Sequence, residues 1–222
     1  MIRPRKTARA IASVVFAALL VACGATPQTA SPTPTAGASE AAATPRPVTS
    51  ADLAHAVVQI VAYLEGETGS AWWGSGTVIS PDGLILTNAH VAVADETEGT
   101  LDRLEVAVTT ASDTPPQPTY IAEVVASDWA LDLAVLRVTE RIGGGALPTD
   151  LKYAALGDSD ALEIGDPIRI LGYPGIGGET ITLTSGLVSG FVSEAGLGNR
   201  AWVKTDATIA GGNSGGMAVN AD

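Results

Sequence analysis

The sequence predicts an all-β domain, either a sandwich or a barrel, over residues 51–222. Short segments rich in Val, Ile, Leu and Thr recur along this part of the chain and are separated by Gly, Pro and Asp. No long stretch repeats apolar residues at the 3.6-residue period of an amphipathic helix. Short strands divided by turn residues are typical of β-sandwiches and β-barrels.

The individual elements follow in chain order. Residues 54–64 are expected to open as a short helix and continue as a strand. Residues 74–80 and 84–93 are expected to form two strands joined by the Pro-Asp-Gly turn at 81–83, because Pro and Gly favour the backbone angles of tight turns. The remaining predicted strands are residues 104–110, 119–128, 133–139, 166–174, 181–191, 200–207 and 217–222.

The N-terminus has the composition of an export signal. Four basic residues precede an apolar run from Ile11 to Ala22, which is too short to span a bilayer comfortably. The run ends in LVAC, which resembles a bacterial lipoprotein box, in which the signal is cut before an acylated cysteine. We therefore expect residues 1–22 to be a lipoprotein signal peptide and Cys23 to be lipidated. The alternative is a plain signal peptide in which Cys23 is incidental.

Residues 23–50 are expected to form a disordered tether between this anchor and the domain. They are rich in Pro, Ala, Thr and Ser and contain no aromatic residue. Such a segment cannot bury enough apolar area to offset the entropy lost on ordering. The alternative is a linker whose length has no spacing role.

The composition excludes several function classes. The formal net charge of −12 argues against a nucleic-acid partner, which would require a basic face. Two histidines and one cysteine cannot supply an ordinary transition-metal site. No phosphate-binding or dinucleotide-binding motif is present, so no cofactor is expected. Nothing among the 24 acidic residues singles out a carboxylate pair for glycoside hydrolysis.

The remaining chemistry is that of a serine nucleophile. Ser214 lies in the stretch GGNSGG, and serine needs a base, which in turn needs an orienting carboxylate. His90, at the end of the apolar stretch LILTNAH, is the candidate base, whereas His55 fits a surface or satisfied structural role. Asp132 directly precedes an alternating strand and is the candidate carboxylate, with Asp128 as the runner-up. Taken alone, each of these features also has a purely structural interpretation.

Four stretches together resemble the HtrA branch of the trypsin-fold serine proteases. They are TNAHV (87–91), DLAVLRV (132–138), GDSDALEIGDPIRILGYP (157–174) and TDATIAGGNSGG (205–216). The resemblance runs from about Val57 to the end of the chain, and the motifs occur in the order His, Asp, Ser. It implies two antiparallel β-barrels with the active site between them, His90 as the general base, Asp132 as its orienter and Ser214 as the nucleophile.

The resemblance also implies the surroundings of the nucleophile. The oxyanion hole would be formed by Gly212, Asn213 and Ser214, with the N–H groups of Gly212 and Ser214 as donors. Thr208, Ile209, Ala210 and Gly211 would border the S1 pocket. Ile209, with no acid at 208, predicts small or medium aliphatic P1 residues.

Two departures from the family pattern carry further expectations. Asn213 replaces the aspartate that pairs with a new N-terminus in digestive trypsins, so regulation by loop rearrangement is expected instead of propeptide cleavage. The chain stops at Asp222, before the hairpin and last strand of the family. The second barrel is therefore expected to be incomplete at its C-terminal side, with no PDZ domain, as in a fragment of a longer product.

The sequence thus predicts a membrane-anchored, extracytoplasmic serine endopeptidase of the bacterial envelope that cleaves unfolded polypeptides through an acyl-enzyme. HtrA-like members are often trimers, so a homotrimer is an expectation that the resemblance alone carries. The first alternative is a non-catalytic protein of the same fold that binds unfolded chains. The second is an unrelated surface β-domain with accidental motifs, in which Ser214, His90 and Asp132 would lie far apart.

Overall fold

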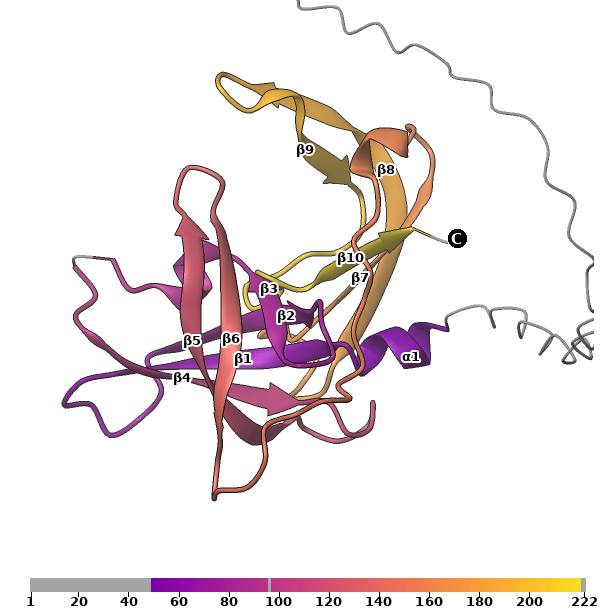
Figure 1. Ribbon diagram of the computed structural model, residues 1–222. Coiled ribbons are helices and arrows are strands. Elements are labelled where there is room, and N and C mark those ends of the chain that lie inside the picture. Colours follow the sequence, from indigo (N-terminus) through magenta and orange to yellow (C-terminus); the bar gives the residue numbers. More distant parts are fainter. Residues whose placement is uncertain (1–48, 96, 221–222) are drawn as a thin grey trace, which may run out of the picture. The chain divides into compact units, whose positions relative to one another are not determined.

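The first half of the domain is a closed six-stranded antiparallel barrel (Figure 1). The computed structural model describes residues 49–95 and 97–220. Around the barrel the strands follow the order β1-β2-β3-β6-β5-β4. Their bounds are β1 (Val57–Leu64), β2 (Trp72–Val78), β3 (Leu84–Thr87), β4 (Leu101–Val108), β5 (Gln117–Asp128) and β6 (Leu133–Arg141). The expected all-β class and the first barrel are confirmed.

The barrel interior is filled by the side chains on the inner face of each strand. Successive side chains of a strand point to opposite faces, so every second residue enters the core. In β6 the buried residues are Ala134, Leu136 and Val138, and in β1 they include Val58 and Ile60. Because these apolar side chains come from strands distant in sequence, their burial holds the closed barrel together.

The turn at 81–83 joins β2 to β3, as the sequence predicted. Gly83 has a φ of +90°, which glycine adopts without steric cost. The Ser80 hydroxyl accepts the N–H of Leu84 at 3.0 Å and thereby closes the turn. The following strand is shorter than predicted. It ends at Thr87, and a single helical turn, α2 (Ala89–Ala92), replaces the expected strand over the last residues of 84–93.

The second half is an open sheet of four antiparallel strands in the order β10-β7-β8-β9. These strands are β7 (Pro167–Gly172), β8 (Thr182–Glu194), β9 (Gly198–Thr205) and β10 (Met217–Asn220), and a 3₁₀ turn, η1 (Ser159–Ala161), precedes them. The sheet curves but does not close (Figure 1), in agreement with the expected incomplete second barrel.

Two small apolar clusters hold this sheet. Ile168, Ile170 and Val188 pack with Ala207 on one side. On the other side Leu171, Tyr173 and Met217 pack against the N-terminal segment, where α1 (Ser50–Ala54) leads into β1. The second cluster therefore ties the open sheet to the first barrel.

The helix α1 begins earlier than the sequence suggested. Thr49 and Asp52 form a capping box, in which Thr49 Oγ1 accepts the Asp52 N–H at 3.2 Å and the Asp52 carboxylate accepts the Thr49 N–H at 2.9 Å. Thr49 and Ser50, which were assigned to the tether, thus belong to the folded domain. The export signal, Cys23 and the tether as far as residue 48 lie outside the described residues. Among the residues that are described, no helix is long and apolar enough to cross a membrane.

Leu136 offers a test of the barrel core, where its side chain is fully buried. We expect Leu136→Ala to lower the free energy of unfolding by about 2–5 kcal/mol, because the lost methyl groups leave a cavity. Urea denaturation followed by tryptophan fluorescence measures this change. The control is Leu133→Ala on the same strand, where the side chain is 42% exposed and the expected loss is below about 1 kcal/mol. Equal losses for the two variants would contradict the described core.

Candidate active site

His90 and Asp132 are in direct contact. Asp132 Oδ2 lies 2.7 Å from His90 Nδ1, and Asp132 Oδ1 accepts the backbone N–H of His90 at 3.0 Å. Because an ionised carboxylate can only accept, Nδ1 must carry the proton of this bond. Nε2 of the neutral ring is then left with its lone pair, as a general base requires.

The positions of His90 and Asp132 are both fixed by the local backbone structure. His90 lies in α2, which the Trp72 indole holds by donating to the Val91 carbonyl at 3.0 Å. Asp132 precedes β6 and has a φ of +50°, the only positive φ of a non-glycine residue in the described chain. Asn88 Nδ2 donates a hydrogen bond to the Asp132 carbonyl oxygen at 2.7 Å. The carboxylate is thus aimed at the ring by a strained backbone that its neighbours hold in place.

The runner-up carboxylate has a different role. Asp128 Oδ1 accepts the N–H groups of Ala130 and Leu131 at 2.8 and 3.2 Å. This hydrogen bonding closes the turn between β5 and β6. Asp132, and not Asp128, therefore contacts the His90 ring. The other histidine, His55, has Nδ1 2.9 Å from the Thr109 carbonyl oxygen, which is the satisfied structural role expected for it.

Ser214 lies in a tight turn against the first barrel. Its carbonyl accepts the Ser75 N–H at 2.8 Å. Gly215 has a φ of +80°, and a Cβ there would lie 2.1 Å from Thr87 Oγ1. Gly212 has a φ of +97°, and a Cβ there would lie 2.4 Å from the Tyr173 carbonyl oxygen. Glycines are therefore required on both sides of the serine because the turn packs directly against backbone and buried side chains.

The same packing brings the Ser214 turn beside the helix that carries His90. A Cβ at Gly74 would lie 3.2 Å from the Ser214 carbonyl oxygen and 2.6 Å from Val91 Cγ2. The main chain of Ser214 and the residue after His90 thus meet across Gly74. No hydrogen bond between Ser214 Oγ and the His90 ring is present within residues 49–95 and 97–220. The structure therefore shows the hydrogen bond between His90 and Asp132. It places the Ser214 turn next to the helix that carries His90, without a hydrogen bond from the Ser214 hydroxyl to the ring.

Two backbone donors of the turn are free within the described part of the chain. The N–H groups of Gly212 and Ser214 donate to no group there, whereas the Asn213 N–H donates to the Ala210 carbonyl at 3.1 Å. The Asn213 N–H closes the turn, and it is not one of the two donors expected for the oxyanion hole. The Asn213 side chain is buried against Gly172, where a Cβ would lie 2.6 Å from Asn213 Oδ1.

The four residues expected to border the S1 pocket lie on the chain leading into this turn. The Thr208 carbonyl accepts the Thr184 hydroxyl at 2.8 Å, which attaches the segment to β8. The Gly211 carbonyl accepts the Gly175 N–H at 2.7 Å. Ala210 is half-buried, but the Ile209 side chain is 59% exposed.

Ser75 was not singled out from the sequence, yet it joins the two halves of the site. Its buried hydroxyl donates to the Gly212 carbonyl at 2.7 Å and accepts the Tyr173 N–H at 2.9 Å. Its carbonyl accepts the Thr87 hydroxyl at 2.7 Å. The available signal was the stretch GSG at 74–76, in which one hydroxyl stands between two glycines on a strand.

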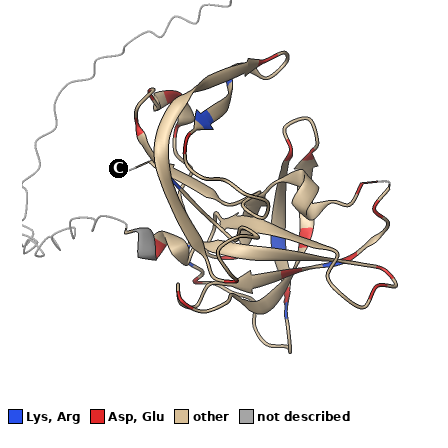
Figure 2. Cartoon of the chain, turned by 180° about the vertical axis from the view of Figure 1, so that it is seen from behind, with Lys and Arg blue, Asp and Glu red and all other residues tan. Residues whose placement is uncertain are grey.

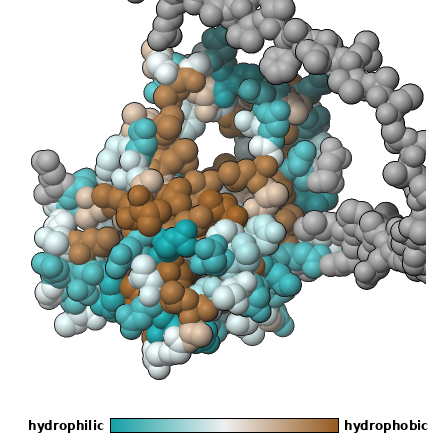
Figure 3. All heavy atoms as spheres, in the orientation of Figure 1, coloured by the Kyte–Doolittle hydropathy of each residue, from teal (hydrophilic) through white to brown (hydrophobic). Residues whose placement is uncertain are grey.

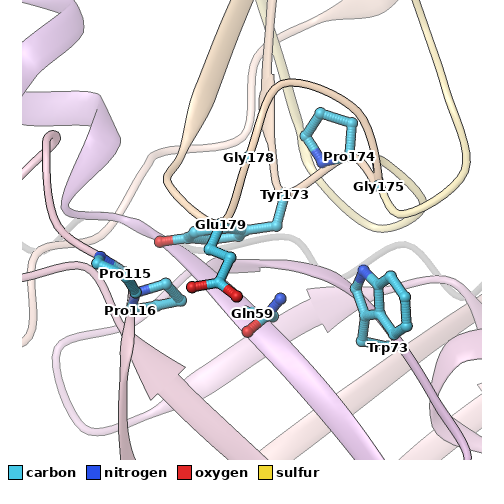
Figure 4. A pocket seen from close by; sticks show the side chains of 9 residues that line it. All are labelled: Gln59, Trp73, Pro115, Pro116, Tyr173, Pro174, Gly175, Gly178 and Glu179. Carbon is cyan, nitrogen blue, oxygen red and sulfur yellow. The ribbon is translucent and has the colours of Figure 1, made fainter.

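The described residues contain no cluster of three or more His, Cys, Asp or Glu side chains that could hold a metal ion. Figure 2 shows Asp and Glu spread over the loops and strand ends, with Lys and Arg few and dispersed. A cleft of about 470 Å³ has Trp73, Gly175 and Glu179 in its lining (Figure 4). It adjoins the chain that leads into the Ser214 turn, because the Gly175 N–H donates to the Gly211 carbonyl.

Comparison with known proteins places this chain among the trypsin-like peptidases. The family described as "Trypsin-like peptidase domain" matches residues 74–222. The chain is 36% identical over 174 residues to the serine protease PepD of Mycobacterium tuberculosis, covering 74% of this chain and 35% of PepD. It is 37% identical over 169 residues to the mitochondrial serine protease HTRA2 of Drosophila grimshawi, covering 72% of this chain and 34% of HTRA2.

Two further similarities agree with these. The magnetosome formation protease MamE of Magnetospirillum gryphiswaldense is 33% identical over 153 residues, covering 67% of this chain and 17% of MamE. The crystal structure of the serine endoprotease from Yersinia pestis matches with a TM-score of 0.57 at 29% identity, over 76% of this chain and 51% of that chain. The chain thus spans about a third or less of the curated relatives.

Ser75→Ala tests the connection between the two halves. The change leaves the Tyr173 N–H without its acceptor and the Gly212 carbonyl without its donor, and we expect it to cost about 1–3 kcal/mol of unfolding free energy. Ser80→Ala is the control, because that hydroxyl bonds in a turn near the surface and its loss should cost less than about 1 kcal/mol. Urea denaturation compares the variants, and equal losses would contradict the role given to Ser75.

Proposed function

The chain belongs to the trypsin-like peptidases of the HtrA type, and from this premise we propose that it is a serine endopeptidase acting through His90, Asp132 and Ser214. The observation that carries the proposal is the contact of 2.7 Å between His90 Nδ1 and Asp132 Oδ2, beside a glycine-bounded serine turn. This contact fixes the ring in the tautomer that a general base needs.

The proposed reaction begins when Ser214 Oγ attacks the carbonyl carbon of a peptide bond while His90 Nε2 takes the hydroxyl proton. The Gly212 and Ser214 N–H groups would stabilise the negative charge that develops on the carbonyl oxygen. His90 then gives the proton to the leaving amine, and an acyl-enzyme forms on Ser214. Water, activated by the same ring, releases the acyl group. Asp132 stabilises the imidazolium through its hydrogen bond to Nδ1.

Unfolded polypeptides are the proposed substrates. Figure 3 shows hydrophobic residues gathered across the middle of one face, where the barrel and the open sheet meet. Trp129, Leu131 and Leu133, which surround Asp132 in the sequence, are all exposed. Such apolar surface suits side chains that a folded protein would keep inside. Ile209 supports a preference for small or medium aliphatic residues at P1.

We propose an extracytoplasmic location with membrane attachment through an acylated Cys23. The basic start, the apolar run and the LVAC ending of residues 1–23 support it. A homotrimer is proposed from the family resemblance. Nucleic acid is not among the proposed partners, because a net charge of −12 would repel its phosphates.

A second candidate function is binding of unfolded chains without catalysis. It is favoured by the missing hydrogen bond between Ser214 Oγ and the His90 ring within the described residues. The two functions differ in one property. A catalytic site must make Ser214 nucleophilic, whereas a binding protein need not.

Fluorophosphonate labelling of the 222-residue chain separates them. We expect covalent modification of Ser214, located by peptide mass spectrometry, because the probe reports a serine activated by its base. Ser214→Ala is the control and should remove the label. An intact, folded chain that takes up no label at Ser214 would favour the binding function and contradict the protease proposal.

Asp132→Asn tests the orienting carboxylate separately. We expect the rate of peptide hydrolysis to fall on the order of 10³–10⁴-fold, because an amide no longer enforces the productive ring tautomer. Asp128→Asn is the matched control. Asn also accepts backbone N–H groups in such turns, so activity should remain within about threefold of the parent. Similar losses for both variants would overturn the assignment of Asp132.

A further inference from the structure

The cleft beside the Ser214 turn is built by both halves of the domain. β1 contributes Gln59 and β2 contributes Trp73, and the connection between β4 and β5 contributes Pro115 and Pro116. The opposite wall is the segment that follows β7, from Tyr173 to Glu179. Figure 4 shows these side chains around a common space, with the Glu179 carboxylate projecting toward Gln59 and Pro116.

The cleft and the nucleophile turn form one packed unit. The Gly175 N–H donates to the Gly211 carbonyl at 2.7 Å, and the Gly212 backbone packs against the Tyr173 carbonyl. Trp73 directly precedes Gly74, which lies against the Ser214 carbonyl. The wall of the cleft and the turn that carries Ser214 are therefore in direct contact.

The lining has the chemistry of a site for a long basic side chain. Trp73 is 48% exposed, so part of its indole is open to a ligand. Glu179 is exposed and forms no hydrogen bond or ion pair with another residue of the described chain. An aromatic face with a free carboxylate matches the apolar stem and charged head of arginine or lysine.

The position of the cleft indicates which part of a substrate would reach it. Thr208, at the start of the expected S1 border, is attached to β8 through the Thr184 hydroxyl, whereas Trp73 belongs to β2 of the first barrel. These two elements approach the Ser214 turn from different halves of the domain. An extended substrate whose P1 side chain lies along 208–211 would continue past Ser214 toward Trp73, on the leaving-group side of the scissile bond.

We propose that this cleft selects substrates with arginine or lysine on the leaving-group side of the scissile bond, and that Glu179 is the specificity-determining residue. The proposal rests on the proposed protease function. It adds a charge requirement to the apolar surface described above, so the preferred substrates are unfolded polypeptides in which a basic residue follows an aliphatic cleavage site.

The test compares the parent chain with Glu179→Gln and Glu179→Lys on quenched fluorescent peptides. The peptides share an aliphatic P1 residue and differ only in one leaving-group-side position, which carries Arg, Gln or Glu. We expect the parent to favour Arg over Glu by about tenfold in kcat/KM at low salt, and 1 M salt to remove most of this preference. Glu179→Gln should reduce the preference to about threefold or less, and Glu179→Lys should reverse it.

Glu140→Lys on β6 is the matched charge control. Glu140 is exposed and forms no ion pair within the described residues, so its reversal changes the overall charge by the same amount as Glu179→Lys. The Arg preference should survive this change. Loss of the preference in Glu140→Lys to the same extent as in Glu179→Lys would attribute it to the general acidic field and overturn the proposal.

Fluorophosphonate labelling of Ser214 in each variant separates this proposal from the one on which it rests, because the probe has no leaving-group-side residues. Equal labelling in parent and Glu179→Lys together with a reversed peptide preference supports the proposal. Equal labelling with no change in preference overturns the role of Glu179 and leaves the protease function intact. Absence of labelling in the parent overturns the protease function and with it the assignment of the cleft to substrate.

Discussion

The arrangement of the site depends on the hydrogen bonds of Ser75. This residue lies on β2 of the closed barrel and bonds through its N–H to Ser214, and through its hydroxyl to Gly212 and Tyr173. Both segments that it holds belong to the second half of the domain. The hydroxyl is buried, so water cannot replace it as a partner. The open sheet, which lacks a closed core of its own, is thus positioned by the barrel at the point where the chemistry would take place.

The other side of the site is controlled by backbone geometry. Asp132 adopts a left-handed conformation that is uncommon for residues with a side chain, and the Asn88 amide holds it there. In this conformation the two oxygens of the Asp132 carboxylate accept one hydrogen bond each, from the His90 ring and from the His90 backbone N–H. The backbone N–H bond keeps the carboxylate in place, and turning the ring would break its own bond to Oδ2, so the ring orientation is set before any substrate binds.

Much of the fold and part of the site could be predicted from sequence because the signals were local. Alternation of Leu136 and Val138 indicated a half-buried strand, and the turn at 81–83 indicated a hairpin. The helical turn around His90 was missed, because four residues are too few to show a helical period. Ser75 was missed for another reason. Its partners Tyr173 and Gly212 lie 98 and 137 positions away in the sequence, farther than any local motif extends.

The Ser75–Gly212 hydrogen bond has a consequence for biosynthesis. The two residues are 137 positions apart in the chain, so the bond cannot form until synthesis has reached Gly212. Contacts of such long sequence separation form after local ones, because the connecting chain must first give up its freedom. The first barrel, residues 57–141, can close before Ser214 has been made. The proposed protease would therefore stay inert toward itself and its neighbours until the Ser214 turn has packed against that barrel.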